Sequence, residues 1–404
     1  MTDRAAYRSR AWFGDEEIEL VFPEHWDVTI SEIRNAPALS VSQLGECIDK
    51  PSASKSLEDL AKAYDSAVIL CEDHTRPLIV HDLICILLDR LNKGGIPDNS
   101  IRILIANGTH RPMSYQEQIH KFGLDVLKRI EVLPHNCYDN QRWVGRTKRG
   151  TPVTIDGSIS EKDLLIGISG IYPHGMAGFS GGAKIILPGV SGIETIEHNH
   201  RELSGASLKL DGNDVREDME EAAQLSGLKF SVNCVVNASR EICAVVAGDF
   251  IIAHRKACKI AKSVYESLLP DYADVLVINA YPMDSELFQA AKALAVTQYY
   301  PMAKHLILIC SCDEGFGYHA LCGPHGRLND WEKKNLENSL KGLDVYVASE
   351  MIGRQALLQK FPPWTKLFAT PEQAIENLDE ELGRASVKAI FFRCAPIEIV
   401  TFRT

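Results

Sequence analysis

The sequence predicts an α/β protein that consists of two α/β domains with mainly parallel sheets. Short apolar, β-rich runs recur along the chain and are separated by segments of helical length. These runs are continuously apolar rather than alternating, which is typical of strands that helices cover on both faces. The chain has 404 residues, more than twice the ~150 residues of a typical domain, so two domains are expected.

Six of these runs are predicted to be strands: Ala67–Cys71, Ile101–Ala106, Leu164–Ile168, Val275–Ile278, Leu306–Cys310 and Val345–Ala348. Between the first two, residues 79–91 carry leucine and isoleucine at helical spacing, and Gly94-Gly95 follows, so this stretch predicts a βαβ unit. A further helix is predicted over residues 253–269. Because Leu269-Pro270-Asp271 ends that helix before a new strand begins, we expect domains of residues 1–269 and 270–404.

Composition excludes several classes of protein. The formal net charge of -11 argues against nucleic acid as a partner, because phosphate backbones select basic surfaces. The N-terminal stretch has no apolar signal region, and nowhere is there a run of ~18 apolar residues that would predict a membrane span. The 11 cysteines are scattered without a CxxC pair, which favours reduced thiols and a cytoplasmic protein.

Polar residues follow three of the predicted strands. DHTRP begins at Asp73, GTHRP contains His110 and YPHG contains His174. Ligands in open α/β sheets bind beyond the carboxyl ends of strands, so these residues and Arg76 are candidates for one crevice. Arg76 is suited to bidentate binding of a carboxylate or phosphate, although a helix cap and a structural ion pair explain DHTRP equally well. The two histidines suit paired acid and base work on one substrate.

A glycine-rich stretch, GFSGG, precedes Lys184. Its glycines could present free backbone N–H groups as an anion nest, although a tight turn with a surface lysine explains the stretch equally well. The stretch lacks the GxxxxGK[ST] pattern, so a P-loop for nucleoside triphosphates is not predicted.

The next segment predicts a helix that begins with a capping box, Ser191 to Glu194. At helical spacing His200 shares an apolar stripe with Ile193 and Ile196, whereas His198 points to the other side and toward solvent. His200 is therefore a core histidine or a metal ligand. A protein-only zinc site normally needs three or four ligands, so a metal at His200 would require a cofactor to supply the others.

In PMDSELFQAAKAL, Gln289 and Lys292 stand three residues apart and share one face of the expected helix. Together they can bind the oxygens of a hydroxy acid. A solvated helix face is the more ordinary explanation for such a pair.

Taken together, these stretches resemble the lactate racemase (LarA) family, whose members use a nickel-pincer nucleotide. The resemblance rests on DHTRP, GTHRP, HGMAGFSGGAKIILPG, TIEHNH and PMDSELFQAAK, which occur in this order between residues 73 and 292. Each motif is weak alone, but the ordered set is specific. It covers about half of the chain.

The resemblance implies a role for individual residues. Lys184 is similar to the lysine that tethers the cofactor, pyridinium-3,5-bisthiocarboxylic acid mononucleotide, through a thioamide. His200 is similar to the direct nickel ligand of the protein. His110 and His174 are similar to the two catalytic bases of the family. The segment that lines the cofactor corresponds to Asp73, His74, Thr75 and Arg76. The substrate-binding residues correspond to Arg76, Gln289, Lys292 and Trp331.

The implied activity is that of a racemase or epimerase, which inverts the C2 hydroxyl carbon of a 2-hydroxy acid by hydride transfer to and from the cofactor. Residues 1–269 would bind the cofactor and carry the catalytic bases, residues 270–404 would contribute substrate-binding residues, and the active-site cleft would lie between the two domains. The implied partners are a small 2-hydroxy acid or sugar acid and the proteins that make the cofactor. The alternatives are a non-catalytic cofactor-binding or carrier protein and an NAD-type dehydrogenase, for which no GxGxxG motif is present.

Three departures from the family pattern bear on the substrate. Phe288 precedes Gln289 where the lactate enzyme has a tyrosine, and Gly175-Met176-Ala177 follow His174 where it has bulkier aromatic residues. Ala183 replaces a basic residue before Lys184. The smaller side chains predict room for a substrate larger than lactate.

Overall fold

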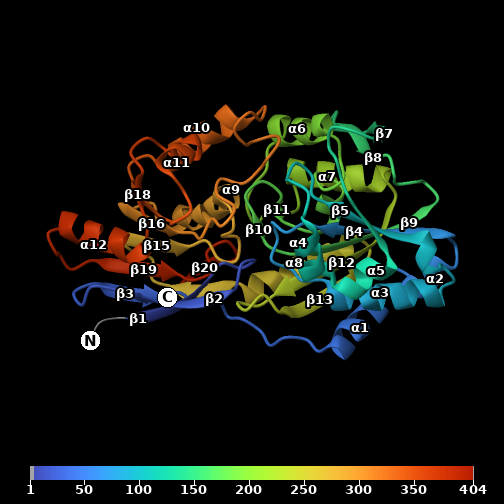
Figure 1. Cartoon of the computed structure of the whole chain (residues 1–404), viewed down its shortest axis with the longest axis horizontal. Coiled ribbons are helices and arrows are strands. Elements are labelled where there is room, and N and C mark those ends of the chain that lie inside the picture. The colour runs from blue at the N-terminus through green and yellow to red at the C-terminus, as the bar shows by residue number, and fades with distance from the viewer. Residues whose placement is uncertain (1–3, 404) are drawn as a thin grey trace. The chain divides into compact units, whose positions relative to one another are not determined.

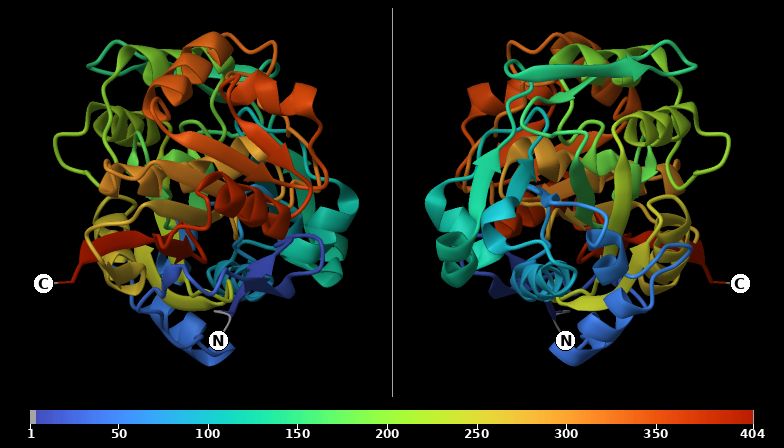
Figure 2. Two further views of the ribbon diagram at one scale, coloured as in Figure 1. Left: turned by 90° about the vertical axis from the view of Figure 1, so that its left-hand side faces the viewer. Right: turned by 90° about the vertical axis from the view of Figure 1, so that its right-hand side faces the viewer.

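The computed structural model describes residues 4–403 and divides into two compact units (Figure 1). Unit 1 combines Met1–Asn35 with Tyr265–Thr404, and unit 2 is Ala36–Val264. The predicted boundary after residue 269 therefore lies close to the observed boundary, but residues 4–35 belong with the C-terminal part of the chain. The reason is that β3 (Asp27–Ile30) pairs in parallel with β19 (Lys388–Phe392), which places a blue strand beside a red one in Figure 2.

Unit 2 is built on a six-stranded sheet with the order β13-β12-β9-β4-β5-β6. All neighbours are parallel except β12 and β13. The strands are β4 (Ser66–Glu72), β5 (Ile101–Ala106), β6 (Glu131–Pro134), β9 (Asp163–Gly170), β12 (Leu228–Val236) and β13 (Ile242–Gly248). The three strands predicted for this region are confirmed, and the two central ones, β4 and β9, are almost wholly buried, as their unbroken apolar runs predict.

Eight α-helices accompany this sheet within the described part of unit 2. The predicted helix between the first two strands is α3 (His81–Lys93), and because β4 and β5 are parallel neighbours, the βαβ unit is confirmed. The others are α1 (Val41–Asp49), α2 (Leu57–Ala61), α4 (Tyr115–Phe122), α5 (Leu124–Arg129), α6 (Ile193–Glu202), α7 (Asp214–Leu225) and α8 (Ile252–Val264). Two hairpins, β7–β8 (Gln141–Arg146, Pro152–Asp156) and β10–β11 (Pro173–His174, Gly178–Phe179), complete the unit.

Unit 1 contains a second six-stranded sheet, entirely parallel, with the order β18-β17-β16-β15-β19-β3. The three strands predicted here are confirmed as β15 (Val275–Asn279), β16 (His305–Ile309) and β17 (Asp344–Ala348), and β18 is Lys366–Phe368. Its α-helices are α9 (Leu287–Ala290), α10 (Asn329–Ser339), α11 (Arg354–Lys360) and α12 (Pro371–Glu381), and the antiparallel strands β1 (Arg4–Ser9) and β2 (Glu16–Val21) form a separate hairpin.

Two predicted helices end earlier than expected. The segment 253–269 is helical only to Val264, and its end forms β14 (Glu266–Leu269), which pairs with β20 (Ile399–Phe402). Burial alternates along β14, which is the two-residue period of a strand. In the second segment, the four-residue helix α9 continues as a 3₁₀ helix over Ala291–Tyr299. Among residues 4–403, no helix combines the length and apolarity needed to cross a bilayer.

Candidate active site

Three polar segments of unit 2 meet at one edge of its sheet. The Asp73–Arg76 segment follows β4, His110 follows β5, and His174 follows β9. Because β4 lies between β5 and β9 and all three strands are parallel, their carboxyl ends share this edge. The predicted gathering of these segments is confirmed at the level of topology.

Asp73 and His110 form a hydrogen-bonded pair in this region. Oδ2 of Asp73 lies 2.7 Å from Nδ1 of His110, and the Thr75 hydroxyl donates to Oδ1 of Asp73 over 2.6 Å. Burial alone would raise the pKa of the Asp73 carboxyl, but the charge and hydrogen bond of His110 hold it well below its usual range. The Asp73 carboxylate therefore accepts a hydrogen bond from the protonated Nδ1 of His110. Nε2 is then the basic atom of the ring.

A buried lysine holds the segment that carries Asp73. Lys121 is 0% exposed, and its ammonium donates to the carbonyl oxygens of Asp73 over 2.8 Å and Leu78 over 3.0 Å. These bonds satisfy a charge that would otherwise be costly to bury. Nothing in the sequence distinguishes Lys121 from a surface lysine of an amphipathic helix, so pattern analysis missed it.

His174 and Lys184 contact each other. Nδ1 of His174 lies 3.3 Å from the Met176 amide and 3.2 Å from the Ala177 amide, while its Nε2 lies 3.4 Å from Nζ of Lys184. Backbone amides can only donate, so Nδ1 of His174 is the acceptor in this network. Nε2 is therefore the ring nitrogen that faces Lys184.

A third residue, His200, is close enough to Lys184 for the lysine charge to affect it. The side chain lies on α6, and its Nδ1 donates to the Ile196 carbonyl over 3.1 Å, so Nε2 keeps its lone pair. Burial and, secondarily, the charge of Lys184 lower the pKa of His200 to about 3. Burial, the larger cause, acts whatever the charge on Lys184. A neutral imidazole whose Nδ1 is bonded to a carbonyl is the form that ligates a metal through Nε2, so the residue fits a nickel ligand.

His198 points elsewhere. Its Nδ1 lies 2.9 Å from the Thr151 hydroxyl, beside the β7–β8 hairpin, so the two histidines of α6 do face different neighbours. Both His198 and His200 are half-buried, so their exposure does not show the predicted contrast between a histidine facing solvent and one facing the interior. The predicted capping box is also wrong: α6 begins after Gly192, and the hydroxyl of Ser191 donates instead to the Ile186 carbonyl over 2.8 Å.

Of the two explanations for the GFSGG loop, an anion nest or a tight turn, the hydrogen bonds of three of its amides favour the turn. The amide of Phe179 donates to Ala177, that of Ser180 donates to Tyr172, and that of Gly182 donates to the Asn233 side chain. These N–H groups are therefore used within the protein. The glycines serve the backbone instead, because Gly181 and Gly182 have φ values of 78° and 57°, in the left-handed region.

A second buried cation, Arg216 on α7, holds this loop. Its side chain is 0% exposed and donates to the carbonyl oxygens of Ala177 over 3.0 Å, Gly181 over 3.1 Å and Phe179. Burial lowers the pKa of Arg216 to about 10, which still leaves the guanidinium charged at neutral pH. The Arg216 side chain thus fixes the loop that precedes Lys184. Nothing in the sequence of α7 predicts that this arginine is buried.

Two of the residues predicted to bind substrate, Gln289 and Lys292 of unit 1, form a local pair. Nζ of Lys292 donates to Oε1 of Gln289, which is only 1% exposed, so the pair is not a solvated helix face. Trp331, by contrast, lies on α10 with 46% of its surface exposed. The ring of Phe288 lies 4.4 Å from the ring of His319 and beneath Nζ of Lys360, 4.0 Å from its centroid.

Comparison with known proteins places this arrangement in context. Residues 13–209 match the lactate racemase N-terminal domain. The chain is 33% identical over 290 residues to the lactate racemase of Lactiplantibacillus plantarum, which covers 68% of either chain. It is 31% identical over 280 residues to the lactate racemase of Thermoanaerobacterium thermosaccharolyticum, 67% of this chain and 65% of that one.

Two solved structures share the fold. The lactate racemase apoprotein from T. thermosaccharolyticum superimposes with a TM-score of 0.79 at 24% identity and covers 98% of this chain and 100% of its own. A Thermotoga maritima protein superimposes with a TM-score of 0.66 at 16% identity and covers 91% of this chain and 100% of its own. The α/β fold with mainly parallel sheets is thereby confirmed.

Proposed function

Because the chain belongs to the lactate racemase family, and is therefore an isomerase of the racemase class, we propose that it inverts the C2 hydroxyl carbon of a 2-hydroxy acid with a nickel-pincer nucleotide. The observation that supports this proposal is the position of Lys184, whose Nζ lies 3.4 Å from Nε2 of His174 and whose charge is one cause of the lowered pKa of His200. In this proposal the three residues serve as tether, proton carrier and metal ligand.

In this proposal Lys184 and His200 hold the nucleotide. Lys184 would hold the nucleotide through its amine, which lies 3.4 Å from Nε2 of His174, and Nε2 of His200 would ligate nickel. The bound group would supply a hydride acceptor. The hydrogen bonds from Arg216 hold the loop before Lys184 in place, so that the proposed tether is kept at a fixed position.

His110 and His174 carry the protons. The two enantiomers of a 2-hydroxy acid present their hydroxyls from opposite sides, so two bases are required. Asp73 holds His110 with Nε2 as the basic atom, and the amides of Met176 and Ala177 orient His174. The residues thus take the hydroxyl proton on one side and return one on the other. His74 and Thr75 would line the cofactor beside Asp73.

Arg76, Gln289, Lys292 and Trp331 are proposed to bind the substrate. Nη1 of Arg76 lies 2.9 Å from the hydroxyl of Thr75, and the guanidinium would bind the substrate carboxylate. Phe288 and the small residues Gly175-Met176-Ala177 favour a longer 2-hydroxy acid or a sugar acid over lactate. Proteins that make the nucleotide are the proposed partners.

Intact-mass spectrometry tests the tether. We expect the wild-type chain, co-expressed with cofactor-making enzymes, to gain the mass of the nucleotide, and Lys184→Ala to gain none. Lys209→Ala, on an exposed lysine of the same unit, is the matched control and should load like the wild type. An unmodified wild-type chain in cells that load a known family member would refute covalent attachment.

A carrier that binds the nucleotide without turnover is the alternative. It would need Lys184 and His200 but not the Asp73–His110 pair. Measuring racemisation and exchange of the α-hydrogen over a panel of 2-hydroxy acids with the loaded protein separates the two. Loading without turnover of any panel member would favour the carrier.

A further inference from the structure

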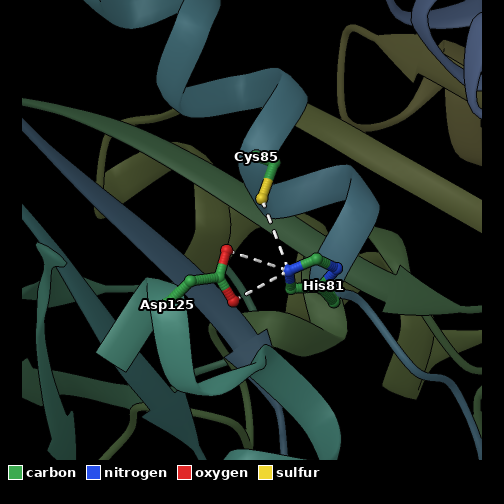
Figure 3. Close-up of side chains that lie close together, drawn as sticks. All are labelled: His81, Cys85 and Asp125. Carbon is green, nitrogen blue, oxygen red and sulfur yellow. Dashed lines mark hydrogen bonds and ion pairs between the residues drawn. The ribbon is translucent and has the colours of Figure 1, made fainter. Parts of the chain in front are cut away.

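A cluster of metal-binding side chains lies on unit 2, apart from the residues discussed above. It consists of His81 and Cys85 on α3 and Asp125 on α5, and the three side chains converge on one point in Figure 3. One ligand atom from each residue lies within 4.8 Å of the other two. From this geometry we propose that His81, Cys85 and Asp125 form a zinc-binding site that joins the start of α3 to α5.

The separations between these atoms are close to those of a tetrahedral zinc site. With Zn–N and Zn–O bonds of about 2.0–2.2 Å and a Zn–S bond of about 2.3 Å, neighbouring ligand atoms stand roughly 3.3–3.6 Å apart. Nε2 of His81 lies 3.0 and 3.1 Å from the two oxygens of Asp125 and 3.7 Å from Sγ of Cys85. Small side-chain rotations suffice to admit the ion.

The helix register explains why the first two ligands meet. His81 and Cys85 are four residues apart on α3, so their side chains lie one above the other on the same face. Asp125 comes from the first turn of α5, which follows α4 after Gly123. The site therefore needs only local helix geometry and the packing of α5 beside α3.

The surroundings of His81 are those of a ligating histidine. Its other nitrogen, Nδ1, lies 2.9 Å from Oδ1 of Asp82, which would fix the ring and make Nε2 a better ligand, as carboxylates commonly do behind zinc-bound histidines. Gly123 leaves the space that the ring occupies, because a Cβ there would lie 2.3 Å from Cδ2 of His81. The glycine also has φ = 86°, which other residues rarely adopt.

The ligand types select the ion. An imidazole, a thiolate and a carboxylate suit zinc, whereas calcium and magnesium prefer oxygen ligands alone. Three protein ligands leave a fourth position for water, and the cluster is reachable, since His81 and Asp125 have side chains 38% and 67% exposed. On binding, Zn²⁺ replaces the Nε2 proton of His81 and the thiol proton of Cys85, and both protons go to solvent.

Without metal, His81 forms ion pairs with the carboxylates of Asp82 and Asp125. The following experiment distinguishes these ion pairs from a zinc site. The full-length, metal-free, reduced protein carrying His200→Ala, to remove the candidate nickel ligand, is titrated with Zn²⁺ against a chromophoric chelator. Parallel titration with Co²⁺ reports thiolate ligation through its sulfur-to-metal charge-transfer absorption.

We expect one zinc equivalent to be bound and a charge-transfer band to appear. Cys85→Ser should remove the band, and both Cys85→Ser and Asp125→Asn should weaken zinc binding by at least 10-fold. Asp82→Asn, which only orients His81, should weaken it by about 10- to 100-fold. Cys47→Ser is the matched control, because Cys47 and Cys85 are the two half-buried cysteines, and it should change nothing.

Two results would overturn the site. One is equal zinc affinity in the parent protein and in Cys85→Ser, and the other is the absence of a charge-transfer band in the parent protein. Asp125 is mostly exposed, so Asp125→Asn is not expected to unfold the chain and keeps the test valid even if Cys85→Ser is unstable. Neither result depends on cofactor loading, so the proposed racemase activity is judged separately.

Discussion

Nε2 of His174 lies 3.4 Å from Nζ of Lys184, so the proposed proton carrier and the proposed tether are in direct contact. The two histidines are therefore not equivalent. His174 contacts the proposed tether through Nε2, whereas His110 is linked to Asp73.

This inequality predicts different outcomes for the two histidine variants. His110→Asn and His174→Asn should each lower kcat by about 10²- to 10⁴-fold, the usual contribution of a general base. Only His174→Asn should also slow cofactor attachment, because Lys184 loses its contact with the imidazole. The measurement is the loaded fraction by intact mass over time, beside the racemisation rate. Equal loading in both variants would contradict the role assigned to His174.

Asp73→Asn should lower kcat by about 10²- to 10⁴-fold with little change in KM, because an amide no longer fixes Nε2 of His110 as the basic atom. The chain offers a matched control. Asp156 and His135 form a similar buried pair, 2.8 Å apart, in which Nε2 of His135 lies 3.0 Å from the Ser191 carbonyl. Asp156→Asn should lower stability and leave kcat unchanged. A loss of kcat as large in Asp156→Asn would mean that Asp73 acts only through folding.

The lowered pKa of His200 predicts a pH-dependent stability. Its folded pKa of about 3 lies below the ordinary 6.5, so below pH 6.5 the unfolded chain takes up a proton that the folded chain refuses. The free energy of unfolding therefore falls as the pH drops from 6.5 toward 3.

Removing that imidazole should flatten the dependence. Between neutral pH and about pH 5, we expect the free energy of unfolding of His200→Gln to fall by on the order of 1–2 kcal/mol less than that of the wild type. The measurement is urea unfolding of the apoprotein. His198→Gln, on the same helix, should follow the wild-type curve. Parallel curves for the wild type and His200→Gln would show that His200 is not buried as a neutral group.

Arg216→Met should destabilise unit 2 by about 3 kcal/mol, because three carbonyl oxygens lose a charged donor while buried. Limited proteolysis should then cut the loop 177–182 faster, and cofactor attachment should decrease. Arg149→Met is the control, since Arg149 forms ion pairs on the surface with Asp214 and Glu217, and its loss should cost about 0–1 kcal/mol. An unaltered cleavage rate in Arg216→Met would refute the clamp.

Lys292→Met should raise KM for a 2-hydroxy acid by about 10- to 100-fold, because a charge-assisted hydrogen bond to a carboxylate or hydroxyl is worth roughly 1.5–3 kcal/mol. Lys333→Met, which removes a lysine that donates to the Leu358 carbonyl in the same unit, is the control. If KM is unchanged in Lys292→Met while kcat falls, the lysine acts on the transition state rather than on substrate binding.

The sequence alone determined the sheets and the edge at which the polar segments gather. The runs that became β4, β5 and β9 are continuously apolar, and a strand with that pattern has to be covered on both faces. Once the strands are parallel, the residues that follow them fall on the same edge. Helical spacing likewise separated His200 from His198, because the angle between side chains on a helix depends only on their separation in the chain.

Only the tertiary structure decided what holds those residues in place. Lys121 and Arg216 act by reaching carbonyl oxygens of distant segments, and no local pattern marks a lysine or arginine that will be buried. The same is true of the Gly182 amide, whose partner Asn233 lies far along the chain, and of β3, which joins the sheet of unit 1 from the far end of the chain. The spacing of apolar residues along a helix or strand shows which of its faces is apolar. The hydrogen-bond partners of its polar atoms depend instead on how the helices and strands pack.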